Sequence, residues 1–263
     1  MNSNSNIALS IDDRGRAGSV AQVVVDSEAR FNILGSVLIK QLISVLDSLR
    51  ENTSLRAVTL TGAGTRAFIG GADINEMSRL DYDTAREFIT DLHRVCASIR
   101  SLPVPVIAKI GGYCLGAGLE IAASCDLRAA TLDSTFGMPE VRVGIPSVIE
   151  AALLPRLIGW GKTRELLFTG ERMTAEEALR IVLIERAAPT EHLDEVVGEW
   201  IDAICKAGRN AVRLQKALIR EWEELPTERA IERGIDYFAE AFKGDEPRFL
   251  MTRFLKRAKN KTD

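Results

Sequence analysis

The chain has 263 residues, of which 46% are hydrophobic and 27% are charged, a composition typical of a folded globular protein and not of a disordered or fibrous one. Its 34 basic and 37 acidic residues give a formal net charge of −3, so the molecule lacks the positive field that attracts nucleic acid or an anionic membrane. We therefore expect neither nucleic acid nor a membrane as a partner.

The first residues of the chain are polar and carry neither the basic patch nor the apolar stretch of a secretory signal. The most apolar long segment, residues 103–125, is interrupted by Lys109 and Glu120, which makes it a poor membrane span. The four cysteines and two histidines show no spacing typical of metal ligands. We expect a cytoplasmic protein without a metal site.

Strand and helix patterns alternate along the first two thirds of the chain. In chain order we predict strands at residues 7–11 and 20–25, a helix at 38–49, a strand at 55–60, a helix at 83–102, a strand at 103–110, a helix from residue 116 or 117, and a strand at 127–130. Such alternation indicates a largely parallel sheet with right-handed crossovers.

Beyond Pro189 the pattern changes to helices alone. These are predicted at residues 193–206, 210–222 and 227–242. The sequence therefore predicts two domains, an α/β core over residues 1–192 and a helical C-terminal module over residues 193–263.

Two glycine-rich segments could expose main-chain N–H groups to a ligand. Residues 67–74 lie where a strand gives way to a loop, and residues 112–120 lead into a helix. Small residues at a helix start bring unpaired N–H groups and the positive end of the helix dipole to one point, which suits a developing oxyanion. Glu120 lies about one turn inside that helix. Either segment taken alone is typical of an ordinary loop.

Taken together, four segments resemble the enoyl-CoA hydratase/isomerase family, the crotonase superfamily, in their order and spacing. They are residues 67–74, 112–120, 136–140 and 154–159, and the resemblance continues through residues 169–178. It implies an α/β fold, a crotonase-like spiral of repeated ββα units, with a C-terminal helical module that serves oligomerisation and covers the active site. It also implies a homotrimer or a hexamer built as a dimer of trimers.

The resemblance assigns the N–H groups of Ala72 and Ala117 to an oxyanion hole for a thioester carbonyl. The implied substrate is an acyl-CoA thioester, with coenzyme A as part of the substrate and no tightly bound cofactor. The positions that the family places against the substrate or coenzyme A are Ala67, Phe68, Gly71, Asp73, Ile74, Asn75, Gly116, Phe254 and Arg257.

Glu120 and Glu140 correspond to the acid–base pair of the family's hydratase branch. The resemblance implies that Glu120 orients and activates a water for attack at Cβ of a 2-enoyl thioester, while Glu140 delivers a proton to Cα. Their apolar sequence neighbours lead us to expect a raised pKa for at least one of them. Taken alone, Glu120 is typical of an exposed helix acid, and Glu140 of a strand-end acid paired with Arg142 or Arg128.

The segment at residues 146–152 departs from the family pattern, because it is one residue shorter and lacks the usual glycines. The side chains expected to line the acyl cavity are Pro139, Ile145, Val148 and Ile149. The bulk of Val148 and Ile149 predicts a reshaped or shortened cavity, and Glu150 adds a third possible acid. We interpret His93 as a partly buried structural residue, although some dehalogenating relatives carry a histidine near this position.

The leading interpretation is a 2-enoyl-CoA hydratase, a hydro-lyase of fatty acid metabolism. An enoyl-CoA isomerase, which needs mainly the Glu140 role, is the alternative within the same class. Val148 stands where dienoyl isomerases and dehalogenases carry an aspartate, which argues against those reactions. A catalytically silent coenzyme-A-binding scaffold is the alternative from a different class, and the presence of both acids argues against it.

Overall fold

The computed structural model describes residues 5–259 of the chain, with side chains through residue 256. The chain forms two compact units, Met1–Ile201 and Asp202–Asp263. Among the described residues, no helix has the length and apolar character needed to cross a membrane.

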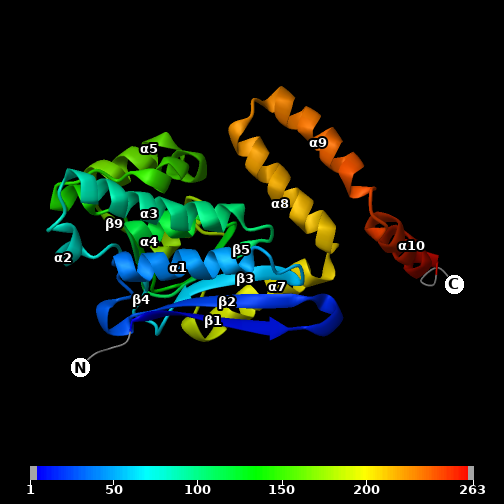
Figure 1. Ribbon diagram of the computed structural model, residues 1–263, viewed down its shortest axis with the longest axis horizontal. Helices are drawn as coiled ribbons and strands as arrows, with labels where there is room; N and C mark the ends of the chain where they lie inside the picture. Colours follow the sequence, from blue (N-terminus) through cyan, green and yellow to red (C-terminus); the bar gives the residue numbers. More distant parts are fainter. Residues whose placement is uncertain (1–4, 260–263) are drawn as a thin grey trace. The chain divides into compact units, whose positions relative to one another are not determined.

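A six-stranded sheet is the framework of the first unit (Figure 1). In spatial order its strands are β1 (Asn6–Asp13), β2 (Ser19–Asp26), β3 (Leu55–Gly62), β5 (Val106–Ile110), β7 (Leu127–Thr131) and β10 (Arg186–Ala188). β1 pairs antiparallel with β2, and the other pairings are parallel, which confirms the largely parallel sheet predicted from the sequence. All of β3 is buried, as expected for a central strand that is covered on both faces.

A second, four-stranded sheet brings distant glycine-rich segments together. Its strands, in spatial order, are β4 (Ala67–Ile69), β6 (Tyr113–Leu115), β8 (Thr135–Gly137) and β9 (Arg172–Thr174). The first three run parallel, with Ala67 opposite Tyr113 and Leu115 opposite Gly137. Each of these strands has only three residues, which is too short for a periodic pattern, so the sequence did not predict this sheet.

Helices cover the six-stranded sheet. Those of the first unit are α1 (Ser36–Leu49), α2 (Ile74–Met77), α3 (Tyr82–Ser101), α4 (Ala117–Ser124), α5 (Leu154–Thr169), α6 (Ala175–Arg180) and most of α7 (Leu193–Lys206). Short 3-10 helices add η1 (Gly15–Ala17), η2 (Glu28–Arg30), η3 (Glu140–Val143), η4 (Ile149–Leu153) and η5 (Thr190–His192). α1 and α3 pack side by side, and every residue of α4 is buried. A single hydrophobic core joins these helices to the sheet.

α3 shows why these residues form a helix. Asp81 accepts a hydrogen bond from the Thr84 N–H, and Thr84 Oγ1 accepts one from the Asp81 N–H, so both ends of a capping box are in place. The buried residues Phe88, Leu92 and Val95 follow at helical spacing and form one apolar face. This face covers the sheet and, as described below, one wall of the candidate site.

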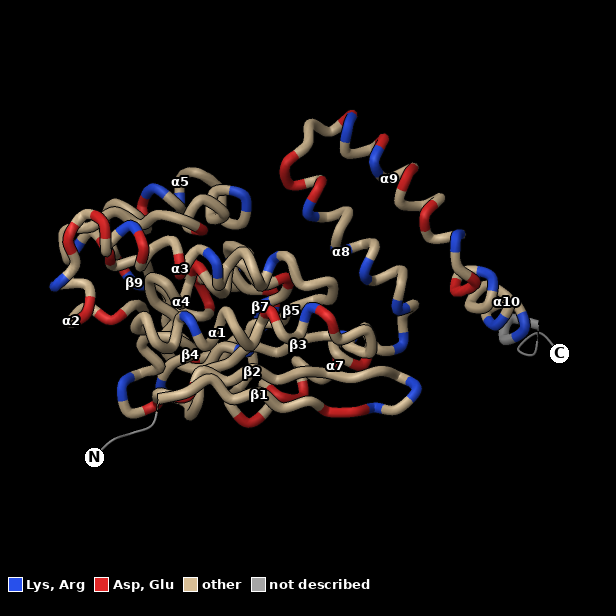
Figure 2. The backbone as a smooth tube through the Cα atoms, in the orientation of Figure 1, with Lys and Arg blue, Asp and Glu red and all other residues tan. Residues whose placement is uncertain are grey.

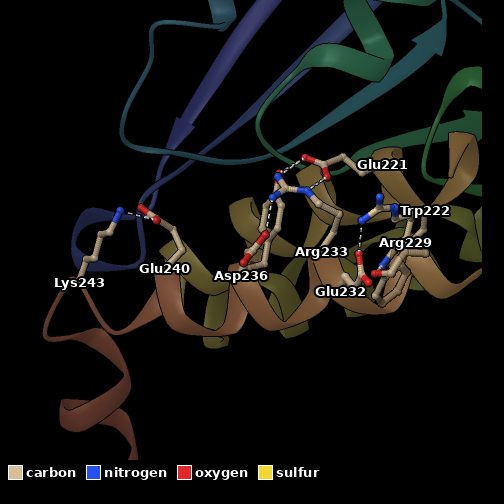
Figure 3. Close-up of polar contacts among 10 residues, drawn as sticks. Glu221, Trp222, Arg229, Glu232, Arg233, Asp236, Glu240 and Lys243 are labelled. Carbon is tan, nitrogen blue, oxygen red and sulfur yellow. Dashed lines mark hydrogen bonds and ion pairs between the residues drawn. The ribbon is translucent and has the colours of Figure 1, made fainter.

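The second unit contains α8 (Arg209–Glu224), α9 (Thr227–Ala241) and α10 (Glu246–Lys259). Polar contacts join α8 to α9 (Figure 3): Glu221 accepts hydrogen bonds from Arg233 and from the Tyr237 hydroxyl, and Trp222 Nε1 donates to the Ala230 carbonyl. Basic and acidic residues are interspersed along α9, whereas the charged residues of α10 after Glu246 are all basic (Figure 2). The helices predicted in this part of the chain are confirmed, and α10 was not predicted.

Candidate active site

The ends of three parallel strands place the candidate site. β4 leads into Gly70 and Gly71, β6 leads into α4, and β8 leads into η3, which begins at Glu140. Because the carboxyl ends of parallel strands meet at one edge of a sheet, these three segments converge. The sequence separates them by tens of residues, and the short strands bring them side by side.

Glycines at the start of α4 allow this convergence. Gly116, the N-cap of α4, has φ 52°, and a Cβ there would lie 2.3 Å from Oε1 of Glu140. A Cβ on Gly118 would lie 2.2 Å from the carbonyl oxygen of Ile69 at the end of β4. Only glycine therefore lets α4 approach both β4 and Glu140. Ala117 is the first helical residue, so its N–H has no acceptor within the helix.

The second main-chain donor lies on the segment after β4. Leu34 donates its N–H to the Gly71 carbonyl and accepts the N–H of Asp73, and these two bonds pin the chain on either side of Ala72. Because N–H groups alternate in direction along extended chain, the Ala72 N–H points away from Leu34. Ala72 and Ala117 both line the same cavity.

Glu120 is buried, although its place on a helix alone is typical of an exposed acid. Its side chain lies on the inner face of α4, and Oε1 accepts the N–H of Ala151 at 3.2 Å. The pKa of Glu120 is raised to about 8, mainly by burial and also by the negative charges of Glu140 and Glu150, while the Ala151 hydrogen bond acts in the opposite direction. The expectation of a raised pKa in this pair is confirmed.

Glu140 faces the same cavity from η3. Burial raises its pKa, and its own N–H and the hydroxyl of Ser147, which donates to Oε2 at 2.8 Å, act in the opposite direction. The ion pairs weighed as an alternative do not form with it: Arg142 pairs with Glu171, and Arg128 pairs with Glu185. Both acids are therefore available to a ligand in the cavity.

The cavity has a volume of about 380 Å³, within the range of small-molecule sites. The predicted site residues that line it are Gly71, Ala72, Ile74, Gly116, Ala117, Glu120, Pro139, Glu140, Ile145 and Val148. Its walls are mainly apolar, and its polar groups are the two carboxyl groups, main-chain amides and the side chains of Ser147, Arg142 and Arg172.

Other predicted site residues lie elsewhere. Ala67 and Phe68 are buried in the hydrophobic core, and Ile149 packs against that core. Asp73 caps α2, where its Oδ1 accepts the Asn75 N–H, and its carboxylate pairs with Arg30, so it supports the loop and does not line the cavity.

Two predicted positions belong to the second unit. Phe254 is exposed on α10. The side chain of Arg257 lies outside the described residues.

The structure adds residues that the sequence did not single out. The hydroxyl of Ser147 donates a hydrogen bond to Glu140, and the N–H of Ala151 donates one to Glu120. Phe88, Leu92 and Met77 complete the apolar wall of the cavity. Phe88 and Leu92 are four apart on α3, so helical periodicity marks them as an apolar face. It does not distinguish a face that meets a cavity from one that meets the core.

Glu120 should make the stability of the protein depend on pH. Its folded pKa of about 8 lies above the ordinary glutamate value of 4.5, so its contribution to stability is fully present below pH 4.5 and is lost as pH rises through about 8. Glu120→Gln, which stays neutral, should gain stability over wild type across this window, by on the order of 3 to 5 kcal/mol at its upper end.

Denaturant unfolding of both proteins between pH 5 and pH 9 measures this difference. A difference that stays constant over that range would show that Glu120 is already ionised in the folded protein at its lower end.

Comparison with known proteins shows that the chain is similar in sequence and in fold to enoyl-CoA hydratases. A family described as enoyl-CoA hydratase/isomerase matches residues 15–262. The chain is 34% identical over 245 residues to the short-chain-enoyl-CoA hydratase of Clostridium acetobutylicum, covering 93% of this chain and 94% of the relative. It is 32% identical over 241 residues to the crotonyl-CoA hydratase of Syntrophomonas wolfei, covering 91% and 93%. The crystal structure of an enoyl-CoA hydratase from Bacillus anthracis matches with a TM-score of 0.89 at 29% identity, covering 95% of this chain and 96% of that one.

Proposed function

The chain belongs to the enoyl-CoA hydratase/isomerase family and has its crotonase-like α/β fold, and we propose that it catalyses the reversible addition of water to a 2-enoyl-CoA thioester, giving a 3-hydroxyacyl-CoA. The observation that carries this proposal is the pair of buried carboxyl groups, Glu120 and Glu140, on one apolar cavity whose wall also presents main-chain amides. An isomerase needs one such acid, whereas hydration of a double bond uses two.

The amides of Ala72 and Ala117 form the proposed oxyanion hole. Addition at Cβ pushes negative charge onto the thioester oxygen, and two fixed N–H donors stabilise that charge more than they stabilise the neutral carbonyl. The N-terminus of α4 adds the positive end of its dipole at the same place. No side chain is required for this role, which agrees with alanine at both positions.

The two acids divide the proton transfers of the reaction. In hydration, the Glu120 carboxylate takes a proton from water as its oxygen bonds to Cβ, and the Glu140 carboxyl gives a proton to Cα. With a pKa of about 8, Glu120 carries its proton at neutral pH. That is the form which hydration leaves behind, and the form which donates to the leaving hydroxyl in dehydration.

A short acyl group suits the cavity best. Ile145, Val148 and Pro139 stand along its acyl side, so bulky side chains take up room there. The relatives named as short-chain-enoyl-CoA and crotonyl-CoA hydratases support a substrate of this size. Coenzyme A enters as part of the substrate, and the proposed reaction needs no tightly bound cofactor.

An absorbance assay with short and medium 2-enoyl-CoA and 3-enoyl-CoA thioesters tests the proposal. Wild type should hydrate the short 2-enoyl substrates, and Glu120→Gln should lose most of this activity because an amide cannot accept the proton of water. Glu165→Gln, an exposed acid on α5 that pairs with Lys162, is a matched control and should keep full activity.

The two alternative functions, an isomerase and a silent scaffold, predict different results in the same assay. Conversion of 3-enoyl but not 2-enoyl substrates, with activity retained in Glu120→Gln, would identify an isomerase. Binding of coenzyme A thioesters without any turnover would identify a silent scaffold.

A further inference from the structure

Ser147 belongs to residues 146–152, the segment that lacks the usual glycines of the family. Its half-buried side chain lines the cavity, and its hydroxyl donates a hydrogen bond of 2.8 Å to Oε2 of Glu140. Within the described part of the chain, no other side chain hydrogen-bonds this carboxyl group. The contact therefore joins a hydroxyl in the cavity wall directly to one of the two proposed catalytic acids.

A closed turn brings these two side chains together. The N–H of Ile145 donates to the Glu140 carbonyl at 3.2 Å, and Gly144 before it has φ 84°, the left-handed conformation that suits glycine. The chain then passes through Pro146, so Ser147 lies beside Glu140 although it is seven positions later in sequence. The turn thus fixes where the hydroxyl lies relative to the carboxyl group.

The two oxygens of Glu140 have different surroundings. Oε2 faces Ser147, whereas Oε1 lies against Gly116 at the start of α4, so closely that a Cβ on this glycine would be 2.3 Å away. The next residue, Ala117, supplies one proposed donor to the thioester oxygen. Because Cα of a bound thioester is attached to the same carbonyl carbon as that oxygen, Oε1 is the carboxyl oxygen on the side of Cα.

Three other ionisable side chains line the cavity, those of Glu120, Arg142 and Arg172. Arg142 makes the ion pair described above, and Arg172 lies over a tyrosine ring, 5.3 Å from its centre. Burial raises the pKa of Glu140, and its own N–H and the Ser147 hydroxyl act in the opposite direction, because both stabilise the ionised form. The hydroxyl therefore acts on the ionisation of Glu140 as well as on its orientation.

Resting on the proposed function, we propose that Ser147 is a positioning residue for Glu140, which holds Oε2 and leaves Oε1 as the oxygen that exchanges a proton with Cα. A carboxyl group whose Oε2 accepts the serine hydrogen carries its own proton on Oε1. In hydration, the O–H bond at Oε1 breaks as the C–H bond at Cα forms, and Ser147 keeps its proton throughout. After the product leaves, water in the cavity returns a proton to Glu140 and takes one from Glu120.

The pH dependence of the reverse reaction, dehydration of a 3-hydroxyacyl-CoA, tests this role. Dehydration needs ionised Glu140 and protonated Glu120, so kcat/KM should follow a bell whose acidic limb reports Glu140 and whose basic limb, near pH 8, reports Glu120. Ser147→Ala removes a hydrogen bond that favours the ionised form of Glu140. Its acidic limb should therefore move up by about one pH unit, while the basic limb stays in place.

The same variant should lower kcat at the pH optimum by about 10-fold with KM nearly unchanged, because the carboxyl group is no longer held in the reacting orientation. This loss is smaller than the roughly 10²–10⁴ expected when the acid itself is removed. Ser147→Thr keeps a hydroxyl and should restore both kcat and the acidic limb. Ser48→Ala, an exposed serine of α1 whose hydroxyl bonds the Val45 carbonyl, should match wild type.

A double variant separates action through Glu140 from direct contact with the substrate. In the Glu140→Gln background, Ser147→Ala should change kcat by less than about twofold, because the group through which it acts is already gone. A further 10-fold loss in that background would show that Ser147 contacts substrate or water itself and would overturn the positioning role. An acidic limb that does not move in Ser147→Ala would overturn it too, since a purely structural role predicts lower activity at an unchanged pH profile.

Titration of the Glu140 carboxyl group by 13C NMR does not depend on turnover. Its signal, identified by its loss in Glu140→Gln, should titrate about one pH unit higher in Ser147→Ala than in wild type, while the Glu120 transition near pH 8 remains. If wild type hydrates no 2-enoyl-CoA, the proposed function fails, and this titration still decides whether Ser147 acts on Glu140. Equal Glu140 titrations in the two proteins would refute that action.

Discussion

Glu140→Gln is expected to lower kcat for hydration by about 10²–10⁴, because the amide keeps the size of the side chain but cannot deliver a proton to Cα. The variant should fold normally, since the amide oxygen still accepts the hydrogen bond of Ser147. KM should change little, because the carboxyl group acts on the transition state and not on the bound thioester. The loss of a conjugated thioester absorbance measures kcat and KM together.

Exchange of the Cα proton isolates the role of Glu140. Wild type should exchange the Cα hydrogen of a 3-hydroxyacyl-CoA with deuterium from solvent, and Glu140→Gln should not, whereas Glu165→Gln should exchange as wild type does. Full turnover in Glu140→Gln with an unchanged activity–pH profile would remove Glu140 from the mechanism.

Ala117→Pro is expected to lower kcat by about 10²–10³, the usual effect of deleting one oxyanion donor. Proline is tolerated at the first position of a helix, since the N–H it lacks has no acceptor within the helix. Gly116 before it has φ 52° and ψ −121°, the mirror image of the extended conformation that a residue before proline prefers, and glycine adopts it without penalty. The substitution therefore deletes a donor with little change to α4.

Ala117→Gly is the control, because it changes the side chain at the same position but keeps the N–H. It should retain most of the activity. Circular dichroism and the unfolding midpoint show whether both variants are folded. Intact activity in a folded Ala117→Pro variant would refute the assignment of this amide to the oxyanion hole.

The sequence predicted the larger elements because their signals are local. Apolar residues at helical spacing marked α1 and α3, and a run of valines marked β2. It did not predict the four-stranded sheet, whose strands of three residues each carry no period. That sheet nevertheless decides where the site lies, because its register sets the end of β4 beside the start of α4.

The candidate site was predictable where its residues belong to compact motifs. Gly71, Ala72, Gly116 and Ala117 stand in segments whose glycines are required by backbone geometry, and all four line the cavity. Ala67 and Phe68, taken from the same motif, are buried in the core. A sequence motif indicates which segment approaches a ligand, but only packing decides which face of that segment contacts it.

The sequence by itself determined the family, the order of the main elements and the presence of Glu120 and Glu140 in glycine-rich surroundings. Only the tertiary structure decided that Glu120 is buried and not an exposed helix acid. It also decided that Ser147 and Ala151 donate hydrogen bonds to the two acids, and that His93 and Glu150, 57 positions apart in sequence, are hydrogen-bonded. The physical reason is that backbone preference and apolar period are properties of neighbouring residues. Burial, charge proximity and the pKa values that follow from them arise when distant segments pack together.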